Sequence, residues 1–337
     1  MNIRIPFVQA VAVAALLLGS ASAGQAWHAA GHMMTAAVAW DQMTPAARKR
    51  VAELLKMNPD YDSWVQGVAD ADKDKTAFVR ASIWPDVIKS RKPEYKDDGE
   101  DPTDPNADAN VGYSDKLMHK YWHYIDLPFA PPNQKVTLIQ PKNPNAETRI
   151  NKHRDTLSAS GASDDLKSYD LVWLIHIVGD VHQPLHATSR FTKLLPQGDE
   201  GGNKVKIKCT PGCGSNLHSF WDGLFDSIEV QHDDAASAQA AIAAAAKLKK
   251  ASGAPVANTD PHSWITESFA IAKKSAYRSP IGTTNKTFTL TASYKKAATA
   301  IGRDRIALGG ARLAKLLNDA FKSSPISGLH FGPYASR

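Results

Sequence analysis

Cysteine is scarce in this sequence. Cys209 and Cys213 are the only two among 337 residues, so no further cysteine completes a thiolate metal site. The two residues flank a short Thr-Pro-Gly segment, and an oxidising compartment favours their union in one small disulfide. We therefore predict a disulfide here, with ligation of a metal by the two thiolates as the alternative.

The sequence also has no long apolar run. Its one short apolar run spans residues 11–18. Arg4 precedes this run, and small residues follow it up to Ala26. That order is typical of a secretory signal and is too short for a spanning helix. Cleavage after Ala23 or after Ala26 fits the pattern. No second apolar span supports an anchor, so we predict an exported chain, periplasmic or secreted, without a membrane anchor.

The sequence has no linker rich enough to divide it and no internal repeat. With 43% hydrophobic and 22% charged residues, its composition is that of an ordinary globular protein. The formal net charge of +6 fits an anionic substrate without requiring one. No segment stands out as an interface, so no obligate protein partner is evident.

Apolar residues recur at helical spacing over most of the chain. We expect helices at residues 31–40, 45–57, 62–71, 166–181, 217–225, 235–250, 263–277 and 291–321, the last with possible breaks at Gly302 and Gly309–Gly310. Thr44 is the expected N-cap before Pro45. The acid-rich stretch 90–116 is expected to be a surface loop with solvated acids. Residues 188–215 predict a small β-hairpin or a long loop, and residues 323–337 a loose tail.

The most informative segment is 174–186, which sets three histidines and an aspartate into an apolar helix. His176 and Asp180 are four apart and share one helix face. A buried imidazole beside a buried carboxylate is costly unless something pairs them. A zinc ion would pair both, because His nitrogen and Asp oxygen are among its usual ligands. His218 and Asp222 repeat the same spacing.

Three other segments place metal-ligand residues among bulky apolar neighbours. His32 follows Trp27 directly after the signal, Asp86 follows Trp84-Pro85, and His123 lies in the aromatic run 121–126. Each alone is more often a satisfied core residue than a ligand. The two His-x-x-x-Asp pairs, without enough nearby Lys or Arg to neutralise the acids, favour a metal centre.

In order and spacing, the motifs from Trp27 to Asp222 resemble the S1/P1 nuclease family, trinuclear-zinc nucleases that prefer single strands and are related to the zinc-dependent bacterial phospholipases C. The resemblance implies an all-α fold with a single mainly helical domain at residues 27–322, after a cleaved signal at 1–26 and before the tail at 323–337. It also implies that a mature N-terminal Trp27 binds zinc through its free amine and carbonyl oxygen, which selects cleavage after Ala26.

The resemblance assigns ligands for three zinc ions. One zinc is held by Trp27 and His32. A second is held by Asp86, His123 and His176, and Asp180 bridges these two zincs. The third is held by His186, His218 and Asp222. His182 matches no ligand position. We expect it either to contact the metal ligands without binding a metal itself or to lie at the surface. Asp86, Lys89 and Asp180 are the implied catalytic residues.

The resemblance further implies a substrate pocket. Lys89 matches a phosphate contact, Tyr124 an aromatic that stacks on a base, and Asp126 and Asn203 groups that hydrogen-bond a base. The ordinary alternatives are a surface lysine, a core tyrosine, a capping aspartate and a turn asparagine.

The implied activity is an endonuclease acting on single-stranded DNA and RNA, with 5′-phosphorylated products and 3′-nucleotidase activity. Zinc lowers the pKa of its bound water from about 15.7 to about 7, so hydroxide held by the metals is the expected nucleophile. The alternative is a zinc-dependent phospholipase C, against which the aspartate at 222 and the Tyr124–Asp126 pair argue. A non-catalytic zinc-binding or structural helical protein is the third possibility.

Overall fold

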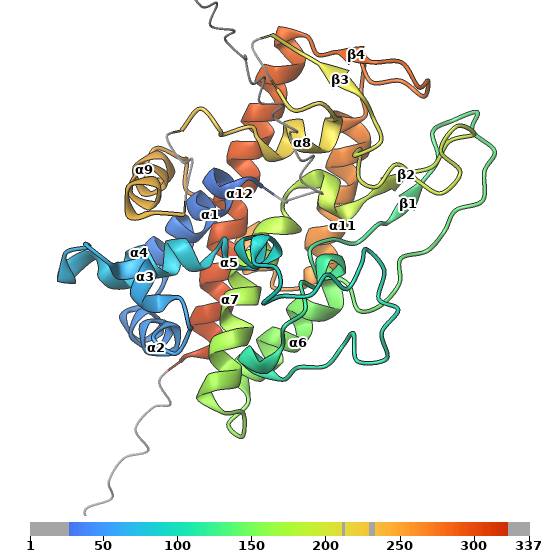
Figure 1. The fold of residues 1–337 in the computed structure, drawn as a ribbon. Coiled ribbons are helices and arrows are strands. Elements are labelled where there is room, and N and C mark those ends of the chain that lie inside the picture. Colours follow the sequence, from blue (N-terminus) through green and yellow to red (C-terminus); the bar gives the residue numbers. More distant parts are fainter. Residues whose placement is uncertain (1–26, 211–212, 229–232, 323–337) are drawn as a thin grey trace, which may run out of the picture.

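A computed structural model describes residues 27–210, 213–228 and 233–322 of the chain. The predicted signal segment 1–26 and the predicted tail 323–337 lie outside the described residues. The fold is mainly helical, as the sequence predicts (Figure 1). Within the described part, none of the helices has both the length and the apolar character that crossing a membrane demands.

Three helices form the centre of the fold: α1 (Ala29–Gln42), α7 (Asp164–Asp180) and α12 (Ala292–Ala320). Each of the three contacts the other two, and Figure 1 shows the others arranged around them. The surrounding helices are α2 (Pro45–Leu55), α3 (Tyr61–Val65), α4 (Lys73–Ala81), α5 (Trp84–Val87), α6 (Ala146–Ser158), α8 (Leu217–Asp222), α9 (Ala235–Ala245), α10 (Ala254–Ala257) and α11 (Pro261–Ile271).

Helix α7 is the buried helix predicted at 166–181. The side chain of Ser163 caps it by accepting from the amide of Leu166, and Asp164 and Asp165 lie in its first turn, where the helix dipole favours negative charge. From Ser168 to Asp180 every residue is buried. Because apolar residues surround this helix on all sides, its polar His and Asp side chains are held inside the core.

The predicted breaks in the last helix are wrong, because α12 is continuous over 29 residues. Its glycines serve close approach instead. A Cβ at Gly310 would lie 2.6 Å from the carbonyl oxygen of Thr35 and from Cβ of Val38, and one at Gly309 would lie 3.0 Å from the ring of His182. The missing side chains therefore let α12 pack directly on α1.

The segment 188–215 is mostly a long loop, as one predicted alternative has it, and at its end Lys206 and Asn216 form an isolated antiparallel bridge of the kind found in a small hairpin. Its two short strands pair in parallel with distant segments: β2 (Ser189–Arg190) with β1 (Pro128–Phe129), and β3 (Ile207–Lys208) with β4 (Phe288–Thr289). A parallel pair needs a long crossover connection and not a tight turn. Cys209 and Cys213, just after β3, form the predicted disulfide.

Several predicted helices are shorter than their sequence pattern. The weak helix at 62–71 is only α3, followed at Gly67 by a positive φ of 72° and a separate 3-10 turn at Asp70–Asp72. Helices α2, α8 and α9 end at Leu55, Asp222 and Ala245. Helix α11 continues as a π-helical turn at Ala272–Ala276.

The acid-rich loop 90–116 is less solvated than predicted. The side chain of Asp98 is only 5% exposed, and its carboxylate lies 3.1 Å from Nδ1 of His119. Asp108 accepts from both Arg149 and Lys152 of α6. These contacts with His119, Arg149 and Lys152, which follow the loop in the sequence, hold the loop against the helices.

Candidate metal centre

Three groups of buried histidine and aspartate side chains lie where the sequence predicts ligands. Within each group the potential ligand atoms lie within 4.8 Å of one another, and this spacing would allow each group to hold a metal ion. The groups are His32, His176 and Asp180; Asp86, His123 and His176; and His186, His218 and Asp222. His176 belongs to two groups, so the first two adjoin.

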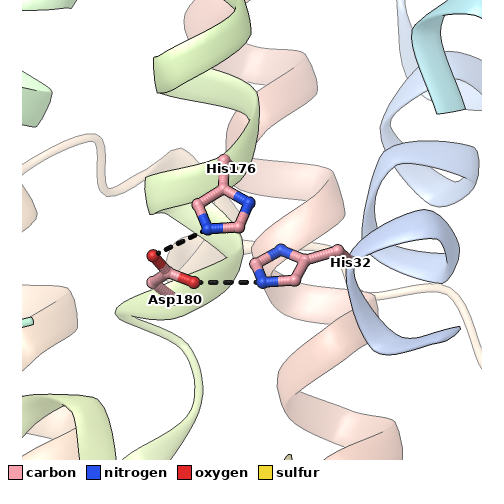
Figure 2. A group of neighbouring side chains, drawn as sticks. All are labelled: His32, His176 and Asp180. Atoms are coloured by element: carbon pink, nitrogen blue, oxygen red, sulfur yellow. Dashed lines mark ion pairs between the residues drawn. The ribbon is translucent and has the colours of Figure 1, made fainter. Parts of the chain in front are cut away.

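The two carboxylate oxygens of Asp180 face different imidazole rings, those of His32 and His176 (Figure 2). Its Oδ1 is 3.1 Å from Nε2 of His32 on α1. Its Oδ2 is 3.1 Å from Nδ1 of His123 and 3.3 Å from Nε2 of His176. One carboxylate oxygen therefore faces each group, which is the arrangement that a bridging ligand needs.

Backbone carbonyls fix the orientation of three imidazoles. A carbonyl oxygen only accepts, so the nitrogen facing it carries the proton. Nδ1 of His176 donates to Ser82 at 2.6 Å, and Nδ1 of His186 donates to the carbonyl of His123 at 2.9 Å. Nδ1 of His218 donates to Gly201, also at 2.9 Å. Each ring therefore turns an unprotonated Nε2 inward, as metal-ligating histidines do.

The third group shows most directly that the donor set fits a cation. Nε2 of His186 and Nε2 of His218 lie 3.0 Å apart, and with both Nδ1 protons donated outward two lone pairs face each other. Burial lowers the pKa of His218 to about 4 and that of His186 well below its ordinary value. Neither ring readily takes a second proton, so a bound cation is the natural partner of both nitrogens.

Burial also shifts the other two groups toward uncharged forms. It lowers the pKa values of His32 and His176 to about 4 and raises that of Asp180 to about 8. Asp86 differs, because the Lys89 ammonium and nearby imidazoles outweigh its burial and hold its pKa below the usual range. In the described part of the chain, both ring nitrogens of His32 and Nε2 of His123 also lack a hydrogen-bond partner.

Two residues that the sequence analysis missed shape the centre. Gly179 precedes Asp180 on α7, and a Cβ there would lie 2.8 Å from Nδ1 of His32. The fully buried Gln183 donates from Nε2 to Oδ1 of Asp222 at 2.7 Å, while its Oε1 accepts from the amide of Leu185. Both lie close to Asp180 in the sequence motif, but the contacts that involve them in the centre are with His32 and Asp222, which are distant in sequence.

Trp27 is the first described residue and is fully buried. Its ring centroid lies 5.8 Å from that of Phe225, and a Cβ at Gly31 would lie 2.7 Å from Cβ of Trp27. The main chain of Trp27 lies two residues before α1 begins at Ala29 and five residues before His32. The adjacent His28 pairs with Asp226 through a contact of 2.7 Å.

A cavity of about 630 Å³ opens beside the third group. His186 and His218 line it together with the predicted base contacts Tyr124, Asp126 and Asn203. Burial, and then the charges of Asp199 and Glu200, raise the pKa of Asp126 to about 7. Lys89 lies apart from these three, where its Nζ is 2.7 Å from Oδ1 of Asp86.

The histidines left out of the ligand set have other partners. His182 is fully buried, which excludes the surface alternative; its Nδ1 donates to Val178 and its Nε2 accepts from Arg312 at 3.1 Å. His119 is held by Asp98 and Asp115. His153 lies 2.9 Å from Asp170.

Comparison with known proteins points to one family. A sequence model described as S1/P1 Nuclease matches residues 27–322. The chain is 32% identical to Endonuclease 5 of Arabidopsis thaliana over 52% of this chain and 60% of that protein. It is 30% identical to Endonuclease 4 of the same plant over 50% of this chain and 57% of that protein. These two matches thus span less than two thirds of the relatives, whereas a 25% identical match to Endonuclease 1 covers 90% of that protein.

Proposed function

Because the chain belongs to the S1/P1 nuclease family, we propose that it is a hydrolase that cleaves phosphodiester bonds in nucleic acids. The observation that supports this most is that His186 and His218 of the third group form part of the wall of a cavity of about 630 Å³. A phosphate in that cavity would lie next to groups suited to hold cations.

The proposed cofactors are three zinc ions. His32 and Asp180, with the main chain of Trp27, would hold the first, and Asp86, His123 and His176 would hold the second together with Asp180. His186, His218 and Asp222 would hold the third. Mixed nitrogen and oxygen ligands of this kind suit zinc. When bound, the zinc ions supply Lewis-acid stabilisation of phosphate charge and lower the pKa of a coordinated water.

The surrounding residues orient this centre. Asp180 fixes the relative position of the first two groups through its two oxygens. Lys89 keeps Asp86 ionised through its contact of 2.7 Å and carries a positive charge suited to a phosphate oxygen. Gln183 holds Asp222 in place for the third ion. Asp86, Lys89 and Asp180 are therefore the proposed catalytic residues.

The proposed substrates are single-stranded DNA and RNA, cleaved to 5′-phosphorylated products, together with 3′-nucleotides. Tyr124 offers a ring on the cavity wall, with its hydroxyl donating to the carbonyl of Glu100 at 2.6 Å. Stacking on such a ring needs an unstacked base, which favours single strands. Asp126 and Asn203 line the same cavity and would hydrogen-bond the base.

The proposed mature protein is a single catalytic domain of residues 27–322 that begins at Trp27 and is exported to the periplasm or the medium. The Cys209–Cys213 disulfide fits an oxidising compartment. The N-terminal sequence of the secreted protein tests this part. A start at Trp27 is expected, whereas a start at Gly24 would separate the free amine from the first metal position.

The activity is tested by digesting single- and double-stranded DNA and RNA with the metal-loaded protein, with and without a chelator. We expect faster loss of single strands, 5′-phosphate ends, inhibition by the chelator and recovery with zinc. Activity that is indifferent to complete metal removal would contradict the proposal. Release of phosphocholine from phosphatidylcholine, without cleavage of nucleic acid, would assign the chain to phospholipase C chemistry.

A further inference from the structure

Three exposed lysines follow one another along strand β3 and the residues just before it. Lys204, Lys206 and Lys208 are exposed, whereas Val205 and Ile207 between them are buried. In a strand every second side chain lies on the same face, so Lys206 and Lys208 are about 6.7 Å apart along the chain, and Lys204 lies in the turn just before them. We call Lys204, Lys206 and Lys208 the lysine stripe.

The lysine stripe begins at the cavity beside the metal centre. Lys204 lines that cavity of about 630 Å³ and also lines a second hollow of about 140 Å³. Lys206, Thr283 and Thr284 line the second hollow as well. The two hollows therefore share a wall, and positive charge and hydroxyl groups continue outward from the proposed site of cleavage.

The segments around the lysine stripe carry no carboxylates of their own. Residues 201–221 and 268–303 contain no aspartate or glutamate, and the β3–β4 pairing joins them through Lys208 and Thr289 (Figure 1). Lys204 pairs with Glu200 at 2.6 Å, whereas within the described residues Lys206 and Lys208 have no carboxylate partner. The second segment contributes further cations, namely Lys273, Lys274, Arg278, Lys286, Lys295, Lys296 and Arg303.

We propose that the lysine stripe binds the phosphodiester backbone of a single strand whose neighbouring nucleotide occupies the cavity. This inference rests on the proposed nuclease function and adds an extended contact to it. Regularly spaced ammonium groups beside a cavity match a linear polyanion with one charge per repeat, and contacts of this kind are independent of base sequence. The stripe should therefore increase affinity for polymers and leave the smallest substrates unaffected.

The kinetic test uses the full metal-loaded protein with Lys206→Gln and Lys208→Gln combined. The matched control combines Lys49→Gln and Lys56→Gln, two exposed lysines at α2, far from β3 in Figure 1. We expect KM for long single-stranded DNA to rise several-fold in the stripe variant, with kcat unchanged and a dinucleotide cleaved as by the parent. An unchanged KM for the polymer, or an equal rise in the control, would overturn the inference.

A binding test separates this inference from the nuclease function. A fluorescent phosphorothioate single strand is titrated with each protein at several salt concentrations, and anisotropy reports binding. The slope of log affinity against log salt should shrink by about 0.7 for each lost phosphate contact, so the double variant should lose about twice that. If the parent and the stripe variant have identical slopes, the inference is overturned, even if the enzyme cleaves dinucleotides. A smaller slope in the stripe variant supports the inference, even if no cleavage is found. Loss of binding to anionic lipid vesicles alone would assign the stripe to a membrane surface and overturn it.

Discussion

The ring of His32 on α1 fills the space that a side chain at position 179 of α7 would occupy. A Cβ on Gly179 would lie 2.8 Å from Nδ1 and 3.2 Å from Cε1 of this ring. The next residue along α7 is Asp180, whose Oδ1 faces the other nitrogen of His32. A glycine in the middle of a helix, which propensity alone would disfavour, therefore allows His32 and Asp180, a proposed ligand and the proposed bridging carboxylate, to approach each other.

Gly179→Ala should displace the His32 ring and weaken metal binding at the first site. Changes in the residues that orient ligands commonly cost about 10–100-fold in metal affinity or activity, and we expect a loss in that range. Gly161→Ala is the control, because a Cβ there meets no atom within 4 Å. Zinc content after dialysis against graded chelator gives the measurement. Full zinc retention with parental activity would show that the ring tolerates the methyl group.

Gln183→Ala should loosen Asp222 and lower metal affinity at the third site. The change removes the amide that donates to Oδ1 of Asp222 at 2.7 Å and leaves the amide of Leu185 without its acceptor. Gln239→Ala is a matched control, since that amide bonds Thr76 instead. Retention of zinc is measured as for Gly179, and equal retention in both variants would exclude a role of Gln183 in holding Asp222.

The charge of Asp126 should make substrate affinity depend on pH. Burial and the nearby Asp199 and Glu200 raise its pKa to about 7 from its ordinary value of 3.8, so the folded protein keeps it neutral below that pH. As pH rises from about 6 to about 8, the cavity gains a negative charge and KM for an anionic substrate should increase.

Asp126→Asn should flatten this rise in KM. The raised folded pKa also means that the carboxyl favours the folded state most below about pH 4 and loses this contribution as pH rises through about 7. The variant should therefore gain thermal stability relative to the parent at pH above about 7. If KM depends on pH in the same way in the parent and the variant, a group other than Asp126 causes the change in KM.

Gly310→Ala should destabilise the fold while leaving the chemistry of the centre intact. The new Cβ would lie 2.6 Å from the carbonyl oxygen of Thr35 and from Cβ of Val38, so α1 and α12 would have to separate. Overpacking of this kind costs about 1–3 kcal/mol, against a gain of about 1 kcal/mol from helix propensity. Thermal unfolding gives the measurement, and an unfolding temperature at or above that of the parent would contradict the close packing.

The sequence pattern predicted which histidines and aspartates come together in the candidate metal centre, but it did not predict the residues that position them. The spacing of His176 and Asp180 is local, because four residues on a helix define one face, and the structure brings both into the centre. Gly179 contacts the ring of His32, and Gln183 donates to Asp222. Because these partners lie far away in sequence, no local pattern predicts either contact. The same reason explains why the pairing of β3 with β4 was not predicted, since Ile207 pairs with Phe288 and no rule of turn formation connects the two.

The assignment of Asp180 and His182 to different roles gives the sharpest prediction for the centre. Asp180→Ala removes the oxygens that face His32 and His176 and should weaken or abolish binding of two zinc ions. His182→Ala instead removes a ring that accepts from Arg312 and donates to Val178. That change should lower the free energy of unfolding by about 1–3 kcal/mol but leave the zinc content unchanged. Elemental analysis of the two purified variants distinguishes the roles, and equal zinc content in both would exclude the bridging role of Asp180.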